Sequence, residues 1–68
     1  MKLVHTVGKL LLTETYRGYR IKYRTYDGLV YFVATLQTDR GVREGRDSQD
    51  TLKAAMARAH QFARGEMH

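Results

Sequence analysis

The chain contains no cysteine, no proline and no tryptophan among its 68 residues. Without cysteine it has neither a disulfide framework nor a cysteine-ligated zinc site to support a small core. This absence fits a reducing compartment, and we expect a cytoplasmic protein. A chain of this size buries only about 60% of its extended surface, so tight packing or self-association must supply the remaining stability.

Long hydrophobic runs are also lacking. No stretch approaches the ~20 apolar residues that a membrane helix requires. The run Leu10-Leu11-Leu12 is shorter than a signal-peptide core, and no small-residue cleavage pattern follows it. We therefore expect a mature protein without a membrane association.

Acidic residues are scarce. Seven Asp and Glu stand against twelve Lys and Arg, which gives a formal net charge of +5. This balance favours a polyanionic partner, either nucleic acid or an acidic protein surface. The alternative is that the charge only keeps a small protein soluble.

What the chain does contain is a strong hairpin signal at Asp27-Gly28, which lies between two alternating runs. Asp-Gly is typical of a two-residue type I′ turn. Such a turn places one uncharged face on the hairpin, with the pairs Tyr19–Leu36, Ile21–Ala34, Tyr23–Phe32 and Thr25–Val30. The other face carries Arg20–Thr35, Lys22–Val33, Arg24–Tyr31 and Tyr26–Leu29. A one-residue slip would place cations opposite the apolar set, so the register is firmly specified.

Residues 1–15 allow more than one interpretation. Residues 2–7 suit a short strand that Gly8 interrupts, and residues 9–16 suit a further extended run. Gly18 lies where the alternation changes phase, which suits a bulge or kink inside one long strand. The alternative is that residues 9–15 form a separate edge strand or a self-association arm.

The C-terminal half predicts one more strand and a helix. Asp39-Arg40-Gly41 supplies a turn, and a third strand should follow over about Val42 to Arg46, with Gly45 as a close contact point for the helix. Asp47 or Ser48 suits the N-cap of that helix and Gly65 its C′ position. One helical stripe is apolar and should cover the uncharged face of the sheet: Leu52, Ala55, Met56, Ala59, Phe62 and Ala63.

The predicted fold is therefore a single α+β domain over residues 1–68. It is a three-stranded antiparallel β-meander with one C-terminal α-helix packed on one face, in the order β-β-β-α. Residues 1–15 add a fourth strand or an arm, and residues 66–68 form a frayed tail.

Residues for enzyme chemistry are poorly placed in the sequence. His5, His60 and His68 lack the spacing of a helical metal site, and His60 beside the apolar stripe suits a half-buried structural role. The carboxylates suit turns, caps and surface positions, and Ser48 has no elbow motif around it. We expect no catalytic activity, no cofactor, no metal and no small-molecule substrate.

The hairpin's charged face is the stronger candidate for function. Arg20, Lys22 and Arg24 form a basic stripe, with Tyr26 and Tyr31 as stacking or packing platforms. Arg43 or Arg46 is expected to extend the stripe from the third strand. Such a face grips phosphates or base edges of nucleic acid. We expect a non-catalytic nucleic-acid-binding module.

The same face supports a second hypothesis. Leu29, Tyr31 and Val33 stand in a row on the exposed side of a central strand, which is more apolar surface than solubility requires. They imply a partner protein, a second copy of the chain in a homodimer, or the N-terminal segment folding back. An antitoxin-like or phage-encoded inhibitor module would use the face in this way.

The order strand, strand, glycine-containing strand and serine-capped helix resembles HicB-type antitoxin domains and the small arm-binding domains of tyrosine recombinases. The residues that carry the likeness are Tyr31, Ala34, Gly41, Gly45 and those from Ser48 to Ala55. The likeness covers about half of the chain. The spacing from Gly41 to the cap departs from the HicB pattern, whose proline-containing turn is missing, so no binding residue is carried over. Both families imply a setting in phages or other mobile elements.

Overall fold

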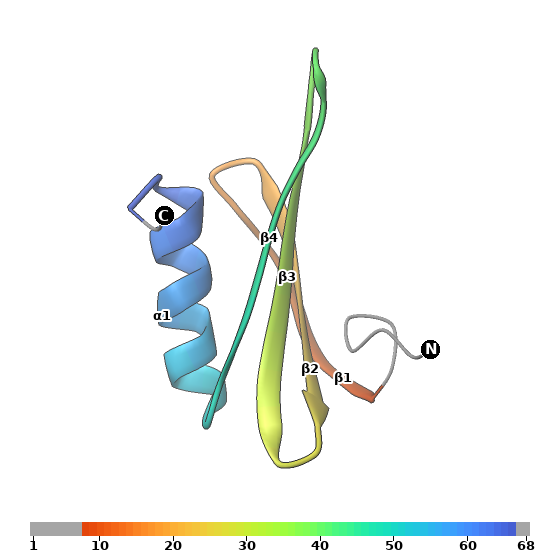
Figure 1. Cartoon of the computed structure of the whole chain (residues 1–68), viewed down its shortest axis with the longest axis vertical. Coiled ribbons are helices and arrows are strands. Elements are labelled where there is room, and N and C mark those ends of the chain that lie inside the picture. Colours follow the sequence, from red (N-terminus) through yellow and green to blue (C-terminus); the bar gives the residue numbers. More distant parts are fainter. Residues whose placement is uncertain (1–7, 67–68) are drawn as a thin grey trace.

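A computed structural model describes residues 8–66 and shows a four-stranded antiparallel sheet with one helix across one face (Figure 1). The elements are β1 (Lys9–Tyr16), β2 (Tyr19–Tyr26), β3 (Leu29–Thr38), β4 (Gly41–Gln49) and α1 (Leu52–Ala63). The strands lie in the order β1-β2-β3-β4. The α+β class and the C-terminal helix are thus confirmed, with residues 9–16 as the additional strand. The strand expected over 2–7 and the end of the tail, 67–68, lie outside the described residues.

The central hairpin β2–β3 has the predicted register. Its pairs run without interruption from Arg20–Thr35 to Tyr26–Leu29. Asp27 and Gly28 have φ of 54° and 77°, as a type I′ turn requires at both of its central residues. The predicted pair Tyr19–Leu36 is not formed, because the pairing between β2 and β3 ends at Arg20–Thr35.

A second two-residue turn joins β1 to β2, and it corrects the interpretation of Gly18 as a bulge. Tyr16 pairs with Tyr19, and the turn residues Arg17 and Gly18 have φ of 51° and 86°. A two-residue turn brings residues i and i+3 to the same face, which accounts for the change of phase at Gly18. The irregularity in β1 lies instead at Leu11, where the register shifts between Leu10 and Leu12.

The core lies between the sheet and α1, which packs against β4, β3 and β2. It consists of Tyr19, Ile21, Tyr23, Val30, Phe32, Ala34, Ala55 and Ala59, and partly buried Leu52, Met56, Phe62 and Ala63 pack around it. These helical residues are the predicted stripe. At Gly45 a Cβ would lie only 2.5 Å from the Phe62 ring, so the glycine is required for the close approach that the sequence predicted.

The start of the helix differs from the prediction. Strand β4 continues to Gln49, beyond the expected end at Arg46, so Asp47 and Ser48 are strand residues. The N-cap is Thr51, whose Oγ1 accepts a hydrogen bond from the Ala54 amide at 3.1 Å. Asp47 accepts instead from the Arg58 side chain. Each extra residue pair with β3 satisfies backbone groups, which favours the longer strand.

The helix ends as the sequence predicted. Gly65 has φ of 79°, and its amide donates to the Phe62 carbonyl at 3.0 Å. The Glu66 amide donates to the Gln61 carbonyl at 2.8 Å. This is the pattern of a Schellman-type C-terminus, which needs a residue that tolerates positive φ.

The outer part of the β3–β4 hairpin extends beyond the rest of the sheet (Figure 1). Past the last β2–β3 pair, three further β3–β4 pairs follow: Leu36–Arg43, Gln37–Val42 and Thr38–Gly41. We call residues 36–43 the arm. The sheet therefore ends in a two-stranded ribbon on the side where the β1–β2 turn lies.

Candidate functional site

The face of the sheet opposite α1, here called the open face, is basic. The strand registers place on it four cations and one acid among polar and apolar residues: Leu10, Thr13, Thr15, Arg20, Lys22, Arg24, Tyr26, Leu29, Tyr31, Val33, Thr35, Gln37, Val42, Glu44, Arg46 and Ser48. Tyr31 and Val33 are half-buried by their neighbours, and Tyr26 is exposed.

The three cations of β2 differ from three of the six other arginines of the protein, which form ion pairs. Arg58 pairs with Asp47, Arg64 with Glu66, and Arg46 with Glu44. Within residues 8–66, Arg20, Lys22 and Arg24 take part in no ion pair. Acids therefore pair with Arg46 of β4 and with Arg58 and Arg64 of the helix and its C-cap, whereas the three cations of β2 have no acidic partner among the described residues.

Arg24 is more buried than Arg20 and Lys22. It pairs directly with Tyr31 across the strands and with Leu10 on its other side. The Arg24 side chain is half-buried, and its Nε is buried without a hydrogen-bond partner among the described residues. The aliphatic stem therefore covers apolar surface while the guanidinium keeps unused donors.

The two cations predicted to extend the stripe from the last strand, Arg43 and Arg46, lie on opposite faces of the sheet. Arg46 pairs with Val33 and lies on the open face, where its side chain contacts Glu44. Arg43 pairs with Leu36, on the side of the helix, and its guanidinium carbon lies 5.8 Å from the centre of the Phe62 ring. Arg43 therefore does not extend the basic stripe. The sequence could not show which of the two cations lies on the open face, because it did not fix the register of the last strand.

The end of the open face near the Asp27-Gly28 turn has more exposed apolar side chains and is here called the apolar end, whereas the opposite, polar end carries the exposed Val42 among polar residues. Leu10, Leu11 and Tyr26 are exposed near the Asp27-Gly28 turn, with exposed fractions of 47%, 42% and 39%. Arg20, Thr35 and Gln37 lie toward the opposite end. The exposed leucines come from β1, whose register the sequence did not specify.

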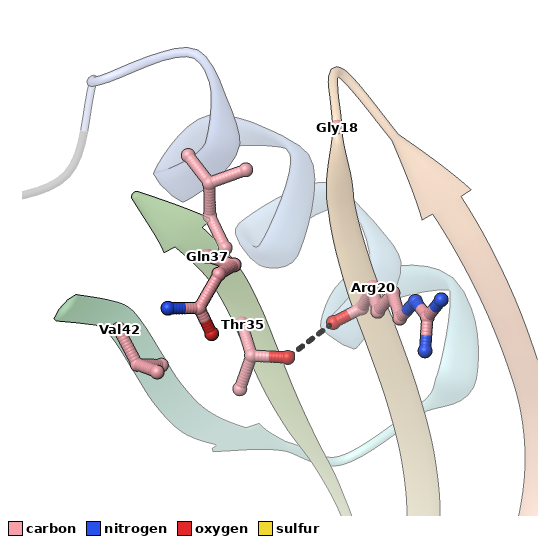
Figure 2. Close-up of a pocket in the computed structure, with 6 residues that line it drawn as sticks. Gly18, Arg20, Thr35, Gln37 and Val42 are labelled. Carbon is pink, nitrogen blue, oxygen red and sulfur yellow. Dashed lines mark hydrogen bonds between the residues drawn. The ribbon is translucent and has the colours of Figure 1, made fainter. Parts of the chain in front are cut away.

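A hollow of about 580 Å³ lies at the polar end, where β2 stops and the arm continues (Figure 2). It is lined by Gly18, Arg20, Thr35, Leu36, Gln37 and Val42. The Thr35 hydroxyl donates to the Arg20 carbonyl at 3.5 Å. Figure 2 shows the Arg20 guanidinium directed away from Gln37 and Val42, so the charge stands at the rim. The sequence did not indicate this hollow.

A polar cluster on the helix side of the sheet was also not predicted from the sequence. Glu14 Oε2 accepts a hydrogen bond from the Tyr23 hydroxyl at 2.5 Å and lies 2.9 Å from His60 Nε2. The His60 ring stacks on Tyr16 with centroids 4.0 Å apart. The cluster joins the edge strand β1 to the helix. His60 is half-buried, as predicted, but Glu14 is not a simple surface residue.

Contacts with neighbouring side chains shift the pKa values of Tyr23 and Glu66. Burial, with the hydrogen bond and charge of Glu14, raises the pKa of the Tyr23 hydroxyl far above its usual value. The hydrogen bonds from Arg64 lower the pKa of Glu66 at the surface. Tyr23 therefore remains a neutral donor to Glu14 at pH values at which an exposed tyrosine ionises.

In the part of the chain from residue 8 to 66, no group of three or more His, Asp or Glu side chains is arranged to hold a metal ion. Within the same range, no helix has the length and apolar character needed to span a membrane.

Comparisons with protein-family models, with curated proteins and with solved structures gave no match. The resemblance to antitoxin and arm-binding domains therefore stays a prediction, and the function must be argued from the site itself.

Proposed function

We propose that this protein is a non-catalytic binding module that contacts nucleic acid through its open face. The observation that carries the proposal is the row of three uncompensated cations on β2, a central strand of the sheet. The phosphate backbone dominates nucleic-acid affinity, and unpaired surface cations are the groups that neutralise it.

The spacing of the stripe suits a charged polymer. Alternate residues of a strand are roughly 6.8 Å apart, so Arg20, Lys22 and Arg24 form a line of charge across the middle of the sheet. Arg46 and the half-buried Tyr31 flank this line on the neighbouring strands. A setting in a phage or another mobile element is part of the proposal.

Fluorescence anisotropy with labelled DNA and RNA, duplex and single-stranded, tests the proposal at about 50 mM salt, where phosphate contacts are strong. If about four phosphates are neutralised on B-DNA, log K falls with log salt with a slope of about −3.6. The double variant Arg20→Ala/Arg24→Ala should lower the magnitude of that slope by about 1.8.

Lys53→Ala is the matched control, because Lys53 is exposed on the helix, away from the open face. It removes a charge without touching the stripe. Absence of binding to every nucleic acid at this salt concentration would refute the proposal.

A second candidate is a protein-interaction module that uses the same face. The exposed Leu10, Leu11 and Tyr26 at its apolar end favour this function, because clustered apolar side chains mark protein interfaces. The partner would be an acidic protein or a second copy of the chain.

Light scattering distinguishes the two candidates. A dimer that Tyr31→Glu or Val33→Glu dissociates would support the protein-interaction module. A monomer whose mass does not change with concentration, together with binding to nucleic acid, would support the first proposal.

A further inference from the structure

In so small a protein, an arm that lies mostly outside the core is unusual. Its three pairs extend roughly 10 Å past the last β2–β3 pair, at about 3.4 Å per residue. Residues 37–43 are all exposed, and Val42 has an exposed fraction of 62%. Leu36 packs against the core, but the exposed residues beyond it add little to the core, since an isolated two-stranded ribbon is only marginally stable in water.

The tip of the arm is nevertheless ordered by its own hydrogen bonds. The Thr38 hydroxyl donates to the Gly41 carbonyl at 2.8 Å and accepts from the Arg40 amide at 3.3 Å. Arg40 is thereby held at the end of the ribbon, and within the described residues its side chain makes no ion pair. The ribbon therefore presents a long cation, Arg40, beside Asp39 at its tip.

The arm and the basic stripe meet at the hollow. Gln37 and Val42 pair with each other on the open-face side of the arm, and Arg20 stands at the rim of the hollow on the β2 side. A ligand that lies along the stripe therefore reaches the hollow at the end of β2, and the arm continues beyond it.

We propose that the arm enters the major groove of duplex DNA, with Arg40 and Gln37 at base edges and one flanking strand crossing the hollow beside Arg20. This inference rests on the proposed function and names its ligand. The major groove is about 12 Å wide and about 8.5 Å deep and admits a two-stranded ribbon, which matches the projection of the arm.

The side chains of the arm match groove recognition. Arginine binds guanine O6 and N7, and glutamine binds adenine N6 and N7, in two-point contacts. Single-strand binding relies on aromatic platforms, whereas residues 36–43 include no aromatic residue. Tyr26 and Tyr31 stand toward the opposite end of the open face. The arm therefore favours a duplex over a single strand.

Anisotropy with one sequence in two forms tests this inference. On a DNA duplex, Arg40→Ala and Gln37→Ala should each weaken binding by about tenfold relative to the charge control Lys53→Ala. On the RNA duplex they should have no effect, because the A-form major groove is too deep and narrow to be read by side chains.

Groove blocking gives a second readout that needs no variant. DNA with glucosylated 5-hydroxymethylcytosine, which fills the major groove, should bind the wild type no more tightly than plain DNA binds Arg40→Ala. A minor-groove ligand such as netropsin should leave the affinity unchanged. Circular dichroism of each variant checks that it is folded.

The outcomes separate the inference from the proposed function. If DNA binding requires Arg20 and Arg24 but Arg40→Ala and Gln37→Ala behave as Lys53→Ala does, the arm inference is overturned and the proposed function stands. Equal losses on the DNA and RNA duplexes would mean that Arg40 contacts phosphate only, which also overturns it. Binding confined to single strands overturns it as well, and no binding to any nucleic acid removes both proposals.

Discussion

Glu14 links three elements through one carboxylate oxygen. It accepts from Tyr23 on β2 and contacts His60 on α1. Its side chain and that of His60 have exposed fractions of 22% and 26%, so the contact is partly shielded from water. Hydrogen bonds to charged groups stabilise a fold more than neutral ones do.

We predict that Glu14→Ala lowers the free energy of unfolding by about 2–4 kcal/mol, because it leaves the buried Tyr23 hydroxyl without its acceptor. Urea denaturation measures the change. Glu14→Gln keeps an acceptor oxygen and should cost less. Thr13→Ala, on the open face of the same strand, is the control, and an equal loss there would contradict the role of the cluster.

Tyr23 predicts the alkaline behaviour of the protein. Above pH ~10 the unfolded chain loses the tyrosine proton, whereas the folded protein keeps it because the pKa of Tyr23 is raised. The folded state then binds more protons, so the free energy of unfolding falls as pH rises, by up to about 1.4 kcal/mol per pH unit.

Denaturation at several pH values between neutral and strongly alkaline tests this slope. Tyr23→Phe removes the proton in question and should have a flatter profile above pH ~10. Parallel profiles for the variant and the wild type would show that Tyr23 titrates with its usual pKa.

Single residues also show where the sequence was insufficient. Glu14 and His60 are 46 residues apart, and no local pattern relates them. Whether Arg43 or Arg46 extends the stripe stayed open in the sequence, because a turn of two residues and one of three place opposite faces of the following strand inward. By contrast, Arg20, Lys22 and Arg24 were placed correctly on one face, since the Asp27-Gly28 turn leaves only one register.

At the scale of elements, the start of α1 shows how a strand displaces a helix cap. Ser48 has the chemistry of an N-cap, but it pairs with Tyr31 in the sheet. Thr51, two residues after the end of β4 at Gln49, caps the helix instead. The end of the preceding strand decides which positions are available for the N-cap. Capping propensity then decides only among those positions.

We predict that Thr51→Ala lowers the free energy of unfolding by about 1 kcal/mol, the usual value for loss of an N-cap hydrogen bond. Ser48→Ala should change it by less than about 0.5 kcal/mol. Thermal or urea denaturation of the two variants measures both values. The reverse order would mean that the helix begins at Ser48, as its sequence suggested.

The two hairpins have the same kind of turn, but the sequence signals for the two turns differ in strength. Asp27-Gly28 and Arg17-Gly18 both have two residues of positive φ. Aspartate tolerates this conformation better than arginine does, so only the first turn was predicted. The glycine and the change of phase around Arg17-Gly18 were visible in the sequence and are equally consistent with a two-residue turn.

For the molecule as a whole, the margin of stability is small. A domain of this size has an unfolding free energy of roughly 3–10 kcal/mol. Phe32 is fully buried at the centre of the core. We predict that Phe32→Ala costs about 3–5 kcal/mol and leaves much of the protein unfolded, as measured by circular dichroism during urea titration.

Phe32→Leu is the matched variant, because it retains most of the buried apolar volume and should lose only part of that energy. If Phe32→Ala remained as stable as the wild type, an additional source of stability, such as a partner copy, would be required. Repeating the titration at several protein concentrations would reveal such a copy.

The sequence by itself determined the β2–β3 register, the separation of cations from apolar side chains, and the helical stripe. These features depend on a short turn and on periods of two and 3.6 residues, which act over neighbouring positions. The tertiary structure alone decided that Glu14 meets His60, that Arg43 lies by Phe62, and that β2 stops short of the arm. Contacts between distant segments depend on where strands end and on which face the helix covers, and no local period encodes either.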